Sequence, residues 1–355
     1  MICVKTSTGG CWGQSRYSRC CGSSGPRTHG IKSLGYYPCL RDDVRILSDY
    51  SLTVEEVYVK FAEKVVLAGG AAQLLDSAGL HRRFAAGTGV TFTAPSWVPD
   101  WRVQTQIPNA IYRLRKPPYR ASVSMAPAFS IVATKIGSAL ATPVLLADTI
   151  TWTTPVLLPG AAGRCEDPFI AAIDMISHIV DTHQDLCRSQ YNGGPGHTSL
   201  AEFMVRTLLM DDLKMEGEGL YGLYTAEISK LGEILRKFQE ESDWLNNRSR
   251  VWPGMKVPAI ASFGEKIRAT LPGRRFTISE TGYMGLVPAV AEPGDLVAVI
   301  PGGSIPYILR EVDDFGPETG GENQYRFVGD CYVHGIMYGE ALEKHGPEMH
   351  DILIV

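Results

Sequence analysis

Cysteine and histidine side chains gather near the start of the chain, where they could bind zinc. Thiolate and imidazole groups are the ligands that zinc prefers, and the first 39 residues carry Cys11, Cys20, Cys21, His29 and Cys39. Zinc fingers usually place two ligands on a C-x2-C pair, whereas Cys20 and Cys21 are adjacent and no such pair exists. We therefore expect neither a metal site nor a bound cofactor.

The chain has no clear arrangement for nucleophilic or phosphate chemistry. The segment Gly302-Gly-Ser-Ile-Pro306 contains a serine but lacks the second glycine of the G-x-S-x-G elbow. Gly217-Glu-Gly-Leu-Tyr-Gly222 has the G-x-G-x-x-G spacing, but it follows a predicted helix and not the strand that a nucleotide-binding loop requires, and no G-x-x-x-x-G-K-[ST] loop is present. His178 and His183 are five residues apart, which puts them on different sides of a helix. We expect no catalytic residue and no enzymatic activity.

Four polar residues in the last quarter of the chain, Asp295, Arg310, His334 and Glu340, have two interpretations. They could form a functional polar cluster. Alternatively, Asp295 builds a turn and Arg310 forms an ion pair at a strand edge, and we favour this second interpretation. Trp97 and Trp101 could likewise grip a ligand, but a tryptophan pair braced by prolines is more typical of a packing anchor.

Composition narrows the class of protein. The 355 residues contain 34 basic and 38 acidic side chains, for a net charge of -4, so no excess of positive charge attracts nucleic acid or an acidic membrane surface. Neither a membrane-spanning run nor a secretory signal is evident. We expect a cytoplasmic protein that binds neither nucleic acid nor membrane.

Local patterns predict helices in the first and middle parts of the chain. Thr53 and Glu56 have the spacing of a capping box, which predicts a helix that ends at Gly69-Gly70 and a short second helix over 71–77. Later helices are predicted from Asp167 to about Gln190, from Ser199 through Leu208, and over 225–244. Residues 105–165 read as irregular strands, among them 128–134 and 149–158.

Short apolar runs separated by turn residues predict a β-rich region near the C-terminus. The predicted strands are 276–278, 296–300, 307–310 and 325–328, and the glycines and prolines between them favour turns. We expect a core that includes Leu296, Val299, Ile308, Leu309 and Phe327.

These predictions give an α+β fold with a helical middle block followed by a small antiparallel β module at the C-terminus. We divide the chain into a disordered Gly/Ser/Cys-rich segment (1–39), a region of helices with the tryptophan motif (40–104), irregular strands followed by the helical block (105–254), the β-rich module (255–343) and a tail (344–355).

Five segments together resemble the fungal heterokaryon incompatibility (HET-domain) protein family, in order and in spacing. They are Pro95-Ser-Trp-Val-Pro-Asp-Trp101, residues 281–288, Pro293-Gly-Asp-Leu-Val297, Ile305-Pro-Tyr-Ile-Leu-Arg310 and residues 328–340. The resemblance runs from about residue 40 to 343 and is weak between 105 and 270. Two departures are Asp330, where the family prefers glutamate, and Tyr338, where a small or acidic residue is usual.

The resemblance implies structural roles for the motif residues. These are Trp97, Pro99, Asp100, Trp101, Gly282, Tyr283, Gly285, Gly294, Asp295, Pro306, Leu309, Arg310, Gly329, Tyr332, Val333, His334, Gly335, Gly339 and Glu340.

The resemblance also implies a function. The family acts in self/non-self recognition and programmed cell death, so the chain is expected to be a regulatory or partner-sensing part with a protein partner. Residues 1–39 do not resemble the family's N-terminal core block, which has a proposed similarity to TIR domains, and 40–104 would be a remnant of the HET-domain region. Two alternatives are a truncated relative of a TIR-like NAD-cleaving enzyme and an inert gene fragment.

Overall fold

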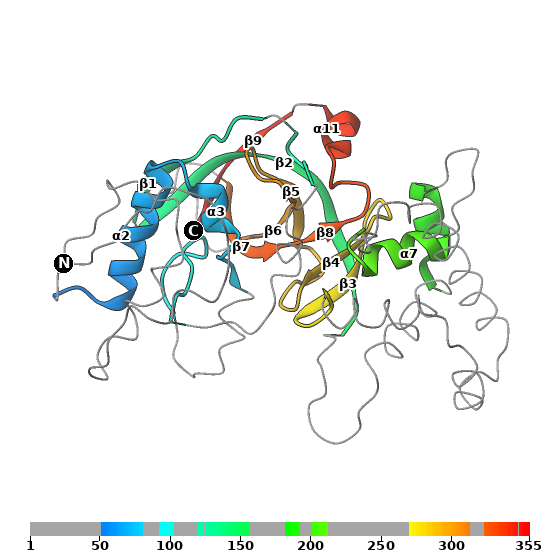
Figure 1. Cartoon of the computed structure of the whole chain (residues 1–355), viewed down its shortest axis with the longest axis horizontal. Coiled ribbons are helices and arrows are strands. Elements are labelled where there is room, and N and C mark those ends of the chain that lie inside the picture. The colour runs from blue at the N-terminus through cyan, green and yellow to red at the C-terminus, as the bar shows by residue number, and fades with distance from the viewer. Residues whose placement is uncertain are drawn as a thin grey trace, which may run out of the picture.

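A nine-stranded β-sheet forms the centre of the protein, with helices at both ends of its longest strand (Figure 1). The computed structural model describes residues 51–80, 92–102, 119–123, 125–135, 137–155, 182–191, 200–211, 270–312, 323–346 and 348–355. The segment 1–39 and the helix expected over 225–244 lie outside the described residues.

The first described helix begins where the capping box predicts. Helix α2 spans Val54–Leu67, with Thr53 at its N-cap. The Glu56 amide donates to Thr53 Oγ1 at 3.2 Å, and the Thr53 amide donates to Glu56 Oε2 at 2.7 Å, so two terminal amide groups are satisfied reciprocally. The apolar face of α2 buries Tyr58 and Phe61, and the short helix α3 (Ala71–Leu75) follows.

The four strands predicted near the C-terminus are confirmed. They are β3 (Arg274–Ser279), β5 (Leu296–Val299), β6 (Tyr307–Glu311) and β7 (Asn323–Asp330). Two more strands in the same region, β4 (Met284–Pro288) and β8 (Tyr332–Val333), continue the sheet from β3.

The sheet extends beyond residues 255–343 because two strands outside that range complete it. Strand β2 (Gly137–Thr153) pairs with β5 along one part and with β9 (His350–Ile354) along another. Since β5, β6, β7 and β9 also pair in that order, these five strands close a ring. The pairing of β7 with β9 is parallel, so the module is not wholly antiparallel as expected.

Strand β2 also joins this ring to the rest of the sheet. Its first residues pair with β1 (Ser130–Thr134), and its last residues pair with β3. Its register shifts between Leu146 and Asp148 and again between Ile150 and Trp152. Such bulges bend a strand, which lets this one strand run from β1 beside α2 to β3 (Figure 1).

Both faces of β5 and of the first part of β6 are buried. On β5, Ala298 packs in a core cluster with α2 and the tryptophan motif, while Val297 and Val299 pack in a second cluster. This explains the continuous apolar runs in these strands, because a strand buried on both faces has no polar side. Of the five predicted core residues, Val299, Ile308, Leu309 and Phe327 are buried, and Leu296 is partly buried.

The helices of the middle block are described only in part. Residues 182–191 are helical, and helix α7 spans Leu200–Leu208 and packs against β4. A short helix, α11 (Glu340–His345), precedes β9. Within the described residues, none of these helices has the length and apolar character needed to span a bilayer.

Candidate functional site

The two tryptophans of the segment 95–101 are buried, as the sequence predicts. Trp97 has no exposed surface, and its Nε1 donates to the carbonyl of Ser138 on β2 at 3.2 Å. The Trp101 ring meets Tyr58 and Phe61 of α2 edge-on, with centroids 5.0 and 5.3 Å away. The segment therefore joins α2 to the sheet, the role of a packing anchor.

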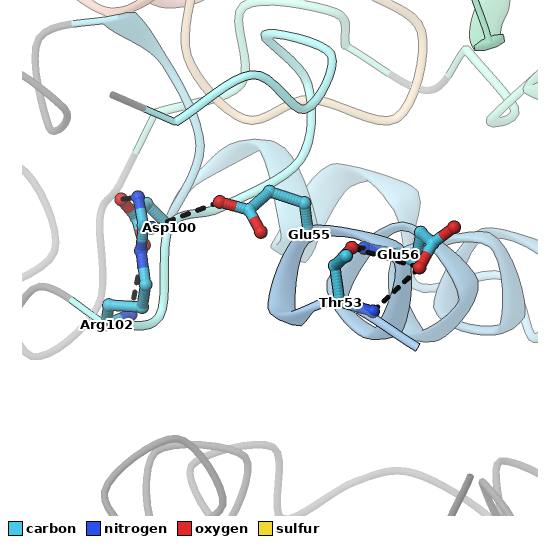
Figure 2. A network of polar contacts seen from close by, with 5 residues as sticks. All are labelled: Thr53, Glu55, Glu56, Asp100 and Arg102. Carbon is cyan, nitrogen blue, oxygen red and sulfur yellow. Dashed lines mark hydrogen bonds and ion pairs between the residues drawn. The ribbon is translucent and has the colours of Figure 1, made fainter. Parts of the chain in front are cut away.

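Polar contacts at the end of this segment tie it to the first turn of α2 (Figure 2). Arg102 donates from Nε and Nη2 to the two oxygens of Asp100 at 2.9 and 2.8 Å, and from Nη1 to Glu55 at 3.1 Å. The same guanidinium lies 4.8 Å from the centre of the Phe92 ring. All of these contacts are intramolecular, so they fix the chain after Trp101 onto the helix.

Ser96 inserts its hydroxyl into the parallel ladder of β7 and β9. The Phe327 amide donates to Ser96 Oγ at 2.7 Å, and Ser96 Oγ donates to the carbonyl of Val355 at 2.5 Å. The Ser96 hydroxyl thus bridges the Phe327 amide and the Val355 carbonyl, two backbone groups that would otherwise face each other.

Asp295 and Arg310 form one pair, as the structural interpretation expects. Arg310 donates to the two oxygens of Asp295 at 2.7 and 2.9 Å, and Asp295 Oδ2 accepts the Glu292 amide at 2.8 Å in the turn before β5. The hydrogen bond to Asp295 raises the pKa of the Arg310 guanidinium. Among the described residues, no contact joins this pair to His334 or Glu340.

A second, more deeply buried ion pair links β3 to the end of β7. Arg274 Nη2 lies 2.5 Å from Asp330 Oδ2, and Nη1 donates to the Asp330 carbonyl at 2.6 Å. The exposed fractions of the two side chains are 3% and 1%. Buried charges require this kind of pairing, so the pair holds the two strands together.

The aromatic cluster around His334 is the described group of side chains best suited to functional chemistry. His334 Nδ1 lies 2.9 Å from the Tyr332 hydroxyl, and the His334 ring contacts the rings of Tyr191 and Phe203. The rings of Tyr191 and Phe203 stack with centroids 4.6 Å apart. Arg206 and Asp211, an ion pair at 2.9 Å, are the charged groups that act electrostatically on His334.

Burial sets the protonation states in this cluster. It lowers the pKa of His334 to about 4, with Asp211 opposing and Arg206 adding to the shift. Burial also raises the pKa of the Tyr191 and Tyr332 hydroxyls, and it raises that of the Cys187 thiol to about 11. At neutral pH the cluster therefore holds neutral imidazole, phenol and thiol, which can pack and hydrogen-bond but do not transfer protons readily.

The described residues contain no group of three or more histidine, cysteine or acidic side chains that could hold a metal ion. Cys187 and Cys331 are buried thiols. The cysteines of 1–39 and His178 lie outside the described residues, and the ring of His183 contacts Trp152.

Comparison with known proteins identifies the region that contains these strands. Residues 260–354 match the Het-6 beta-barrel domain. Over 85 residues the chain is 40% identical to "Heterokaryon incompatibility protein 6, OR allele" of Neurospora crassa. The C-terminal region of this chain is thus similar to heterokaryon incompatibility proteins. The aligned part covers 24% of this chain and 12% of the relative's length, and no solved structure matches the chain.

The Het-6 barrel explains where the resemblance motifs lie. Gly282 and Gly294 adopt positive φ angles of 96° and 97° in the turns before β4 and β5. Gly285 lies where a Cβ would come within 2.7 Å of the Tyr332 carbonyl, so β4 and β8 approach closely there. The other motif residues lie on or next to its strands and turns: Tyr283, Pro306, Leu309, Gly329, Tyr332, Val333, His334, Gly335, Gly339 and Glu340. Pro99 and Asp100 belong to the tryptophan segment.

Sequence reasoning missed three residues that define the sites on this barrel. Tyr191 lies just past the helix predicted to about Gln190, and Phe203 lies on the next predicted helix. Both are far from His334 in sequence, and nothing local marks them as its neighbours. Arg274 gave no signal either, because it is followed by a second arginine in the strand and nothing local shows which of the two is buried.

Acid should weaken the Het-6 barrel through His334. The folded-state pKa of about 4 lies below the ordinary 6.5, so this contribution is complete above pH 6.5 and is lost as the pH falls toward 4. Between pH 7 and pH 5 we expect the free energy of unfolding to fall by about 2 kcal/mol more in the native chain than in a His334→Gln variant. Urea denaturation of both chains at the two pH values measures the difference, and equal losses would show that His334 is not the responsible group.

Proposed function

We propose that this chain acts in the cytoplasm as a partner-sensing part of fungal self/non-self recognition and does not itself catalyse a reaction. The observation that carries the proposal is the match of its C-terminal region to the Het-6 barrel and to the Neurospora protein. The partner is a protein, and its engagement feeds a programmed cell death pathway.

The contacts of the motif residues support a scaffold rather than a catalyst. Asp100 is paired with Arg102, Asp295 with Arg310, and Asp330 with Arg274. A charge held in such a pair stabilises the fold but is poorly placed to act on a substrate. The partly buried imidazole of His334 is neutral at the pH of the cytoplasm, because its pKa is about 4.

Expression in a fungal host tests this proposal. In a single Neurospora strain we expect residues 1–355 to leave viability unchanged. In forced heterokaryons of strains that differ at the locus of heterokaryon incompatibility protein 6, we expect the same chain to reduce cell death several-fold, because it competes for the shared partner. A Trp97→Ala chain, which loses its anchor, is the matched control and should not interfere.

Each of the other outcomes contradicts the proposal. Death in the single strain with a falling cellular NAD pool would indicate the TIR-like enzyme instead. Death caused by residues 1–355 but not by 40–355 would assign an activity to the Cys-rich segment. Unchanged death in the heterokaryons at matched protein levels would indicate an inert fragment.

A further inference from the structure

The hydroxyl of Tyr191 occupies a place in the β-sheet that a backbone hydrogen bond would normally fill. The register pairs Gly285 with Val333, so Met284 lies opposite His334 as the next pair of the β4–β8 ladder. One of the two expected bonds is present, from the His334 amide to the Met284 carbonyl at 2.9 Å. The other is replaced: the Met284 amide donates to Tyr191 Oη at 2.8 Å, and Tyr191 Oη donates to the His334 carbonyl at 3.0 Å.

The helical segment that carries this hydroxyl buries few of its side chains completely. Within residues 182–191, Cys187 is the one side chain classed as fully buried, and Leu186 is 36% exposed. By contrast, α2 buries five side chains. The other contacts of residues 182–191 include the hydrogen bond from Lys344 to Gln190 at 3.2 Å and the close approach of the Leu186 backbone to Gly282. Segments with few buried apolar contacts open at a low free-energy cost.

We propose that residues 182–191 form a releasable strap, clipped to the Het-6 barrel by the Tyr191 hydroxyl. When the strap leaves, the Met284 amide can donate directly to the His334 carbonyl, and Tyr191 bonds to water instead. No backbone group of the barrel is left unpaired in either state, so release avoids the penalty of an orphaned buried donor or acceptor. Release uncovers the rings of Tyr283 and His334, both of which contact Tyr191.

Another hydroxyl relay in the described part of the fold shows why this one is releasable. Ser96 also bridges two backbone groups, but the next residue along the chain is the fully buried Trp97. Undocking Ser96 would expose that indole to water. The free-energy cost would be that of losing a large aromatic side chain from the core. Undocking residues 182–191 instead exposes the small, fully buried Cys187 and the ring of Tyr191, which is only partly buried.

Two buried thiols allow the strap to be tested in the full chain. Cys187 lies on the strap, whereas Cys331 lies in the barrel core, and both are fully buried. Alkylation with N-ethylmaleimide under native conditions, followed by peptide mass spectrometry, gives the labelling rate of each thiol. Strap release exposes Cys187 alone, while global unfolding exposes both.

Tyr191→Phe removes the hydroxyl that bridges Met284 and His334 and keeps the aromatic ring. We expect the labelling rate of Cys187 to rise roughly tenfold, which corresponds to the free energy of about one hydrogen bond. The labelling rate of Cys331 should stay unchanged. Hydrogen exchange by NMR should show the Met284 amide still protected, because it now bonds to His334. Equal acceleration at both cysteines would overturn the proposal in favour of a purely structural tyrosine, and so would no acceleration at either, or loss of Met284 protection.

Gly282→Ala tests the same strap without touching the hydroxyl. An added Cβ would lie 2.5 Å from the Leu186 carbonyl, so the helix must move away. Gly294→Ala is the matched control, since Gly294 has nearly the same positive φ but nothing within 4 Å of an added Cβ. Selective labelling of Cys187 in Gly282→Ala and not in Gly294→Ala is expected. Similar labelling in the two variants would mean that backbone strain, and not strap contact, is responsible.

Discussion

Replacing Trp97 with Ala should lower the free energy of unfolding by about 3–5 kcal/mol, the range for large aromatic residues in cores. The side chain is fully buried, and its Nε1 bonds to the Ser138 carbonyl of β2. The substitution therefore leaves a cavity and an unpaired carbonyl between α2 and the sheet. Urea denaturation followed by tryptophan fluorescence and by circular dichroism measures the change.

Two further variants separate the packing of Trp97 from its hydrogen bond. Trp97→Phe keeps most of the ring and loses Nε1, so it should cost much less than Trp97→Ala. Leu67→Ala, at a side chain that is 78% exposed on α2, should change stability by less than about 0.5 kcal/mol. If Trp97→Ala behaved like Leu67→Ala but abolished interference in the heterokaryon experiment, Trp97 would be a partner contact instead.

Breaking the buried ion pair should have an effect of similar size. Asp330→Asn leaves the Arg274 guanidinium buried beside a neutral amide, and removing one partner of a buried pair typically costs about 3–5 kcal/mol. The double variant Arg274→Met with Asp330→Leu removes both charges and should recover most of that loss. Thermal and urea denaturation of the single and double variants provide the measurement.

A more exposed pair serves as the control for this prediction. Arg206 and Asp211 are each about 20% exposed, so Asp211→Asn should cost only about 1 kcal/mol or less. A loss in Asp330→Asn no larger than that in Asp211→Asn would mean that water reaches Arg274. A double variant as unstable as Asp330→Asn would mean that the pair is needed for its hydrogen bond to the Asp330 carbonyl and not for charge balance.

The sequence allowed the local elements to be predicted where their causes lie within a few residues. Thr53 and Glu56 are three positions apart, so the capping box and the start of α2 follow from local hydrogen bonds. The strands around Phe276, Leu296, Tyr307 and Tyr325 follow from apolar runs bounded by turn residues. Burial of Trp97 follows from the size of the indole and its flanking prolines.

Strand β2 was the largest element that local reasoning could not assemble. A proline such as Pro143 argues against a continuous strand, because proline lacks an amide donor for the ladder. In the structure, Pro143 lies within the strand opposite Asp351 of β9. Residues 344–355 were expected to be a tail, yet they contain that strand, whose pairing depends on β2 and β7 being already in place.

What the sequence by itself determined is thus the set of elements, the apolar residues that fill the core and the resemblance to heterokaryon incompatibility proteins. Only the tertiary structure decided which strands pair, that β5, β6, β7, β9 and β2 close a ring, and that Tyr191 meets Met284 and His334. The physical reason is that capping, turn and helix preferences are energies of neighbouring residues. The β2–β9 pairing, the Arg274–Asp330 pair and the strap join residues far apart in sequence: Arg274 and Asp330 are 56 positions apart, and Thr142 and Ile352 are 210 positions apart. Their stability comes from backbone and side-chain groups that are brought together only when the whole domain has folded.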